Sequence, residues 1–156
     1  MLAIQAVELQ LIIGLAVTVT LGSGVGPIVR CVGRLIPIPP PNEEAVTVRL
    51  WTRLIEQNTG GAYIGFFERL IFFAAFWTQA AWPIFPSWLA FKLAFYWQGA
   101  NFTAFPEKAP ESTKDFEWLV ARRQLGTHHV ATVLVGTAAN IVAGLAGYAV
   151  GKWIPL

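Results

Sequence analysis

The sequence predicts an all-α integral membrane protein with four transmembrane helices and two short amphipathic helices on the cytoplasmic side. Three observations lead to this prediction. Hydrophobic residues make up 55% of the 156 residues, charged residues only 13%, and the mean hydropathy is +0.54. Long runs without a charge recur along the chain, and Lys and Arg gather in two of the segments between them. Such a composition is too apolar for a surface that faces water.

The first apolar run, residues 9–29, has 21 residues without a formal charge. At about 1.5 Å per residue, a helix of this length crosses a hydrocarbon core of about 30 Å. A cleaved signal peptide is the alternative. The residues before the run carry no Lys or Arg, and no cleavage site of the A-x-A kind follows it, so a membrane span is favoured.

The second apolar block, residues 61–105, is about twice as long as one crossing requires. Two prolines and two tryptophans lie near its middle, in residues 82–88. Because proline interrupts helices and tryptophan favours the headgroup boundary, we predict a hairpin of two spans, 61–82 and 87–105. The alternative is a single span over 70–91, which would bury both prolines in mid-membrane.

The last apolar block, residues 125–150, is long enough to cross with some tilt. Basic residues gather in the first and third segments between the spans: Arg30, Arg34, Arg49 and Arg53, then Lys108, Lys114, Arg122 and Arg123. The positive-inside rule therefore places these segments in the cytoplasm and both termini outside. The three-span alternative would instead place Arg122 and Arg123 outside.

Both cytoplasmic segments contain the pattern of an amphipathic helix. Residues 42–58 begin at Asn42, a favourable N-cap, and carry apolar and charged side chains on different faces. Residues 112–123 begin with a capping-box-like Ser112-x-x-Asp115. We expect both helices to lie on the inner leaflet, where the arginines of the second approach lipid phosphates. Solvated connectors without a membrane contact are the alternative.

The composition argues against several function classes. A net charge of +2 is too small to predict a nucleic-acid-binding surface. Cys31 is the single cysteine and is interpreted as a plain thiol. His128 and His129 are adjacent on a helix and point about 100° apart, so they do not converge on one metal ion. We expect no catalytic residue, no metal site and no cofactor other than bound lipid; a pigment or haem at one of the histidines is a less favoured alternative.

Four polar residues are predicted to lie inside the membrane: Glu68, Arg69, Lys92 and Asn140. Counted from a hairpin tip near Ile84, Glu68 lies about 24 Å down its helix and Lys92 about 12 Å down the next. This difference in depth argues against a direct ion pair. We therefore expect Glu68 and Arg69 near the inner interface, where Glu68 meets one of the arginines Arg49, Arg53, Arg122 or Arg123. Lys92 is expected to be held by Asn140, by helix carbonyls or by Glu8. An ion or proton route through Glu68 and Lys92 is the alternative.

Small residues recur at helical spacing on the first and last spans. One stripe contains Gly14, Thr18, Gly22 and Gly26, and the other contains Gly136, Asn140, Gly144, Gly147 and Gly151. Small residues let helix backbones approach closely in lipid, where Asn140 adds an interhelical hydrogen bond. The sequence leaves open whether these faces meet within one chain or between chains.

Three short motifs carry a resemblance. They are Gly61-x-x-Ile64-Gly65-x-x-Glu68-Arg69, then Ala90-x-Lys92, then Gly136-Thr137. This set resembles an uncharacterised class of small bacterial multi-pass membrane proteins with a GxxIGxxER, AxK and GT pattern. The resemblance covers roughly residues 60–145. It implies a bacterial cytoplasmic-membrane protein in which Glu68, Arg69, Lys92 and Thr137 belong to one structural unit.

Two functional hypotheses follow. The favoured one is a non-catalytic accessory or assembly subunit of the inner membrane, with seven Trp and eleven Phe available for packing against another membrane protein or its own copies. The alternative is a small ion channel or transporter that works as an oligomer, because four helices of this size are too few to enclose a pore alone.

Overall fold

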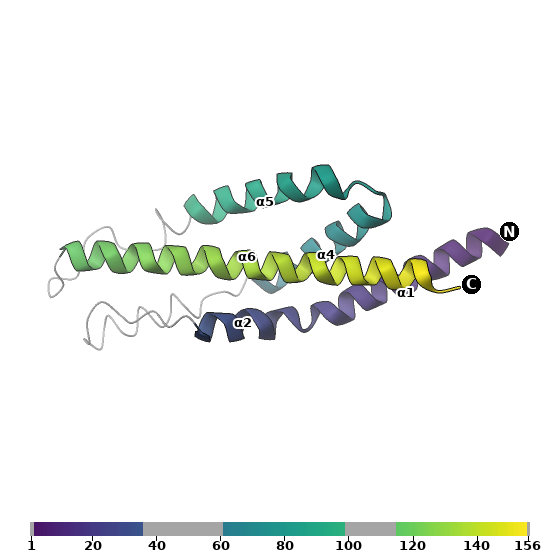
Figure 1. Cartoon of the computed structure of the whole chain (residues 1–156), viewed down its shortest axis with the longest axis horizontal. Helices are drawn as coiled ribbons and strands as arrows, with labels where there is room; N and C mark the ends of the chain where they lie inside the picture. Colours follow the sequence, from purple (N-terminus) through teal and green to yellow (C-terminus); the bar gives the residue numbers. More distant parts are fainter. Residues whose placement is uncertain (1, 36–60, 99–114, 156) are drawn as a thin grey trace.

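The computed structural model describes residues 2–35, 61–98 and 115–155, and every secondary-structure element in these ranges is a helix. The elements are α1 (Leu2–Gly22), α2 (Val25–Leu35), α4 (Gly61–Trp77), α5 (Ala81–Gln98) and α6 (Asp115–Trp153). They form an elongated bundle in which α6 runs antiparallel to α1 and α2, and α4 and α5 form a hairpin beside them (Figure 1). Both termini lie at the same end (Figure 1).

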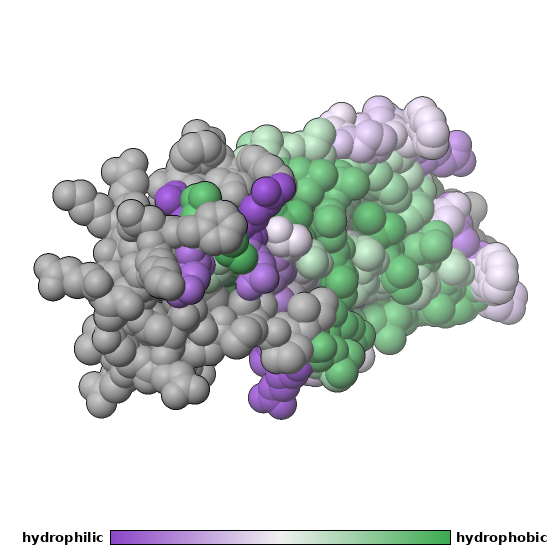
Figure 2. Space-filling model, turned by 60° about the vertical axis from the view of Figure 1, so that its left-hand side comes forward, coloured by the Kyte–Doolittle hydropathy of each residue, from purple (hydrophilic) through white to green (hydrophobic). Residues whose placement is uncertain are grey.

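Two stretches are long and apolar enough to cross a membrane, Ile4–Leu35 and Glu117–Trp153. The hairpin helices α4 and α5 are shorter, with 17 and 18 residues. On the face shown in Figure 2, hydrophobic residues gather in a broad band, with hydrophilic residues at both of its sides. The predicted all-α class is therefore confirmed, together with two helices suited to a bilayer.

The helical stretch that contains the first predicted span, 9–29, extends beyond it at both ends and is not one continuous helix. The chain is helical over α1, turns at Ser23 and Gly24, and continues as α2. At the turn, the amides of Ser23 and Gly24 bond to the carbonyls of Thr20 and Leu21, three residues back. The Ser23 hydroxyl also donates to the Thr20 carbonyl. These local bonds replace the helical ladder for one turn and separate the two helices.

The turn of the hairpin lies at Thr78–Ala80, not at 82–88 as predicted. The Ala80 amide bonds to the Ala75 carbonyl and the Gln79 amide to the Phe76 carbonyl, which is the bonding of a Schellman helix end. Gln79 has a φ of 60°, a left-handed conformation usually taken by glycine. The prediction missed this end because no glycine marks it.

Both prolines lie within α5, Pro83 in its first turn and Pro86 in its second, and neither ends α4. Pro83 lies in the first turn of α5, where the backbone amides have no helical partner in any case, so the missing N–H costs no hydrogen bond. Pro86 lies one turn further inside the helix, and the Ser87 hydroxyl donates to the Pro83 carbonyl at 2.8 Å. Prolines in a first turn have the same sequence signature as prolines that break a helix, which explains the misplaced turn.

The described part of the predicted connector 112–123, residues 115–123, and the predicted span 125–150 join into one helix, α6, without a break at Arg122 and Arg123. The charged residues in the first part of this helix end at Arg123 and an apolar run follows, but no proline or glycine lies at Arg122 and Arg123 to end the helix. The predicted amphipathic helix 42–58 lies outside the described residues.

The glycine stripes meet within one chain, along the contact between α1 and α6. A Cβ on Gly14 would lie 2.7 Å from the Gly147 carbonyl oxygen, and one on Gly151 would lie 2.7 Å from that of Gln10. A Cβ on Gly147 would collide with the Thr18 hydroxyl. Thr18 is fully buried, and its hydroxyl donates to the Gly14 carbonyl. The two backbones therefore touch at positions where only glycine fits.

Other glycines of the two stripes lie against different helices. A Cβ on Gly144 would lie 3.0 Å from the Phe73 amide of α4, and one on Gly136 would lie 3.3 Å from Val29 of α2. Gly26 is exposed and does not pack against α6. The break before α2 changes the helical register, so Gly26 no longer faces the same side as Gly14.

We predict that Gly14→Leu inserts into the membrane normally but loses the compact bundle. Overpacking of this kind costs about 1–3 kcal/mol, while the added leucine favours insertion. Membrane fractionation measures insertion, and thermal unfolding in mild detergent measures the stability of the bundle. Gly26→Leu is the matched control, since it makes the same change at an exposed position of the same stripe. Equal unfolding temperatures of the two variants would contradict a close-packed seam.

Candidate functional site

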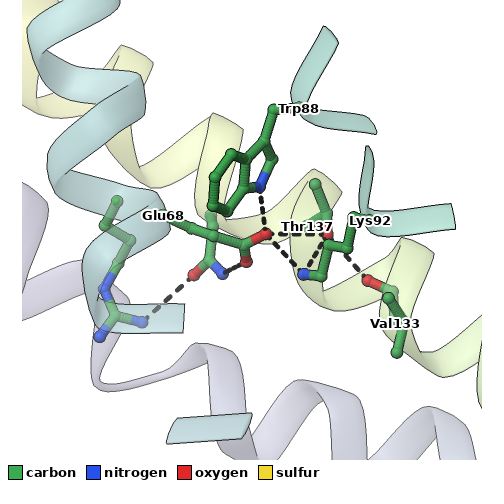
Figure 3. Close-up of polar contacts among 7 residues, drawn as sticks. Glu68, Trp88, Lys92, Val133 and Thr137 are labelled. Atoms are coloured by element: carbon green, nitrogen blue, oxygen red, sulfur yellow. Dashed lines mark hydrogen bonds and ion pairs between the residues drawn. The ribbon is translucent and has the colours of Figure 1, made fainter. Parts of the chain in front are cut away.

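The most organised polar feature is a buried group of side chains around Glu68, here called the Glu68 cluster: Glu68, Trp88, Lys92, Thr137 and Asn140 (Figure 3). Glu68 lies in the middle of α4 and is only 1% exposed. Its Oε1 accepts hydrogen bonds from Trp88 Nε1 at 2.7 Å and from Lys92 Nζ at 2.5 Å. Its Oε2 accepts one from Asn140 Nδ2 at 2.8 Å. One carboxylate thus ties α4 to both α5 and α6.

Lys92 is held by α6 as well as by Glu68. Its Nζ donates to Thr137 Oγ1 at 2.6 Å, and the Thr137 hydroxyl donates to the Val133 carbonyl at 3.0 Å (Figure 3). Lys92 is 7% exposed and Thr137 is 2% exposed. The ammonium group therefore exchanges water for a carboxylate and a hydroxyl, both of which stabilise its charge.

The prediction that Glu68 and Lys92 lie too far apart in depth for an ion pair is wrong. The actual turn at Thr78–Ala80 places both residues at similar depth, since Glu68 precedes Gln79 by about 17 Å of helix and Lys92 follows it by about 20 Å. Asn140 bonds to Glu68 and not, as expected, to Lys92. The misplaced hairpin tip alone produced the error.

Arg69 extends this polar network to α1. Its Nη1 donates to the Asn140 side-chain oxygen at 3.2 Å and to the Gly22 carbonyl at 3.0 Å. A Cβ on Gly22 would overlap the Arg69 side chain, so this glycine makes room for the arginine. The guanidinium of Arg69 thus reaches from α4 to the C-terminal end of α1, where a cation interacts favourably with the last helical carbonyls. The expected position of Arg69 near the inner interface stays a prediction.

The network carries one positive charge in excess, because Glu68 faces both Lys92 and Arg69. Removal of one partner from a buried ion pair destabilises the folded state by more than the intact pair stabilises it, because the remaining charge is buried without a partner. Arg69 Nε is buried and has no hydrogen-bond acceptor among the described residues. The hydrogen bonds of the Glu68 cluster stabilise its charged groups inside the bundle. They also determine which faces of α4, α5 and α6 pack together.

The sequence analysis identified Glu68, Arg69, Lys92 and Asn140 individually, and the resemblance grouped Thr137 with three of them. It missed Trp88, which was assigned to the headgroup boundary at the hairpin tip. Trp88 and Lys92 are four residues apart on α5 and so share one face of that helix. This spacing was the available signal that both side chains reach the same partner.

The other candidate residues lie away from the cluster. His128 is buried beside Gly33 of α2, and its ring centroid is 6.3 Å from that of His129. Cys31 is exposed on α2. Within residues 2–35, 61–98 and 115–155, no group of three or more His, Cys, Asp or Glu side chains is placed to hold a metal ion.

Comparison with protein-family models, with curated proteins and with solved structures finds no match to this chain.

We predict that Lys92→Met destabilises the bundle by about 3–5 kcal/mol, because it leaves the Glu68 carboxylate buried without a cation. Glu68→Gln should also destabilise, since it leaves Lys92 uncompensated. The double variant should lose less than the sum of the two single losses, because neither charge then remains. Unfolding in mixed detergent micelles measures all three.

Lys152→Met is the control for this comparison. Lys152 is exposed and contacts the Trp77 ring at 4.5 Å, an interaction that contributes about 0.5–1 kcal/mol. Additive losses at Glu68 and Lys92, or a loss at Lys92 no larger than at Lys152, would contradict a direct buried pair.

Proposed function

We propose that the chain is a non-catalytic, four-span protein of a bacterial cytoplasmic membrane that acts as an accessory or assembly subunit. In this proposal it packs laterally against another membrane protein or against its own copies. The resemblance in the GxxIGxxER, AxK and GT motifs supports the bacterial membrane. Lateral packing is supported by α5, which contacts the bundle with one face and exposes aromatic side chains on the other, as described below.

Several features support the four-span arrangement with both termini outside. The termini lie at the same end of the bundle (Figure 1), as an even number of crossings requires. The hairpin helices have about 25 Å of length each, which a modest thinning of the bilayer accommodates. Arg30 and Arg34 lie at the end of the bundle opposite to the hairpin turn, and the positive-inside rule places this end in the cytoplasm.

The inner face of α5 is occupied by the bundle. Phe85 packs edge-to-face against Phe72 and Phe76 of α4, with ring centroids 5.1 Å and 5.0 Å apart. Trp88 and Lys92 reach the Glu68 carboxylate. These contacts fix the position and rotation of α5 against α4 and α6.

The outer face of α5 carries aromatic side chains in a row. Trp88 packs against Phe91 with a centroid distance of 5.8 Å, and Phe91 stacks on Phe95 at 6.2 Å. Phe91 and Phe95 are each 62% exposed. The row therefore begins at the Glu68 cluster and ends on the surface. Aromatic side chains are enriched at protein interfaces because they supply large contact area at low entropic cost.

The topology is testable with the native cysteine. A membrane-impermeant maleimide should label Cys31 only from the cytoplasmic side. In a Cys31→Ser background, Thr78→Cys, an exposed position in the hairpin turn, should be labelled only from the outside. Labelling of both positions from one side would contradict the four-span arrangement.

We predict that the wild-type protein extracted in mild detergent retains a stoichiometric protein partner or a second copy, and that Phe91→Ala/Phe95→Ala loses it. Tyr63→Ala/Phe67→Ala is the matched control, since these rings are 75% and 60% exposed but lie on α4. Cross-linking in membranes before extraction, followed by mass determination, measures the complex. A wild-type monomer without partner would contradict the accessory role, and equal loss in both variants would contradict the α5 face.

One observation favours the second candidate, a small oligomeric channel or transporter. The break between α1 and α2 lies next to the buried charges, with Arg69 bonded to Gly22 just before it. Helices interrupted in mid-membrane beside charged groups are typical of transporter ion sites. Ion flux in proteoliposomes that is lost in both Glu68→Gln and Lys92→Met, but kept in Lys152→Met, would favour this candidate over the accessory role.

A further inference from the structure

Helix α2 has two distinct faces. One face packs on α6: Val25 is buried, Val29 lies beside Gly136, and Gly33 lies beside His128 and Thr132. The opposite face carries two arginines four residues apart, Arg30 and Arg34, and both are exposed. Helix α2 thus packs on α6 with one face and exposes two positive charges on the other.

This charged face borders a shallow, open groove of about 330 Å³ on the surface of α2. Five residues of α2 line it: Pro27, Arg30, Cys31, Arg34 and Leu35. Leu35 is 74% exposed, and Ile28 beside the groove is 49% exposed. Cationic and apolar side chains therefore alternate around one opening, as in a surface at the boundary between lipid headgroups and acyl chains.

Neither arginine is neutralised by the described part of the chain. No ion pair between a described carboxylate and Arg30 or Arg34 is present. Arg30 is turned back along α2, so that its Nη1 lies 3.7 Å from where a Cβ on Gly26 would be. One turn further along the chain, Arg34 directs its charge to the same face. Two guanidinium groups one turn apart match a phosphate group, which accepts several N–H bonds.

We infer that this groove binds the phosphate of an anionic phospholipid, with Arg30 and Arg34 as its ligands and the acyl chains against Ile28 and Leu35. The position fits this ligand, because α2 follows the apolar helix α1 within the stretch Ile4–Leu35, which is long and apolar enough to cross a membrane. Basic pockets at the ends of membrane helices recognise such headgroups. The inference requires that α1 and α6 lie in a bilayer and is independent of the lateral partner.

The first test is native mass spectrometry of the full chain released from nanodiscs of phosphatidylcholine and phosphatidylglycerol in equal amounts. The wild type should retain phosphatidylglycerol. Arg30→Gln/Arg34→Gln should bind it about thirtyfold more weakly, since each arginine near a membrane surface contributes about 1 kcal/mol. Arg123→Gln/Lys152→Gln removes the same net charge at exposed positions outside the groove and should retain the lipid. Equal loss in both double variants would overturn the site in favour of general surface charge.

The second test uses Cys31, the single cysteine of the chain, as a reporter inside the groove. Its alkylation by N-ethylmaleimide should be several-fold slower in phosphatidylglycerol nanodiscs than in phosphatidylcholine nanodiscs, because the bound headgroup covers the thiol. In Cys31→Ser/Gln124→Cys, the new thiol lies at an exposed position of α6 and controls for the lower surface pH of an anionic bilayer.

Two outcomes of the second test would overturn the inference. Equal slowing at both cysteine positions would mean that surface charge, and not a bound headgroup, slows the reaction. Protection of Cys31 by inorganic phosphate in phosphatidylcholine nanodiscs would mean that the groove takes a free anion and not a lipid. Selective protection of Cys31 by phosphatidylglycerol, lost in Arg30→Gln/Arg34→Gln, is the result that supports it.

Discussion

A carboxylate and an ammonium group buried between helices stabilise only those arrangements that bring them together, because either charge alone is costly in an apolar surrounding. The Glu68–Lys92 pair imposes this constraint on the whole hairpin. It requires α4 and α5 to turn near the midpoint between the two residues, and it requires α6 to bring Thr137 and Asn140 to the same place. Arg69 then carries the constraint to α1 through the Gly22 carbonyl.

Close approach of the backbones is the condition that makes these short polar contacts attainable. Gly14 and Gly147 bring α1 against α6, and Gly144 brings α4 against α6. Gly65 serves the cluster directly, since a Cβ there would lie 3.3 Å from the Asn140 side-chain nitrogen. In a bilayer, where lipid tails are as apolar as leucine, no hydrophobic force would hold these helices together if larger side chains separated them. Packing and polar bonding therefore depend on each other in this bundle.

The sequence predicted the helical class, the apolar segments, the charged residues of the interior and the glycine faces, because these depend on composition and periodicity. It did not predict the hairpin turn, since Gln79 takes a conformation that usually marks glycine and Pro83 begins a helix while appearing to end one. The resulting shift of roughly 7.5 Å in the depth of each residue concealed the ion pair and removed Trp88 from consideration. The continuity of α6 was also missed, because a change in charge at Arg122 was taken as a boundary although the backbone has none.

The central claim is that Glu68 and Lys92 are in direct contact within the assembled bundle. Solid-state NMR on the full chain in lipid bilayers, with ¹⁵N-labelled lysine and ¹³C-labelled glutamate, measures this contact, and Lys92→Met assigns the signal. A 2.5 Å separation between Nζ and Oε1 predicts strong dipolar coupling from the Lys92 ammonium to one carboxylate carbon, and its loss in the variant. A spectrum in which Lys92 couples to no glutamate carboxylate would contradict the account.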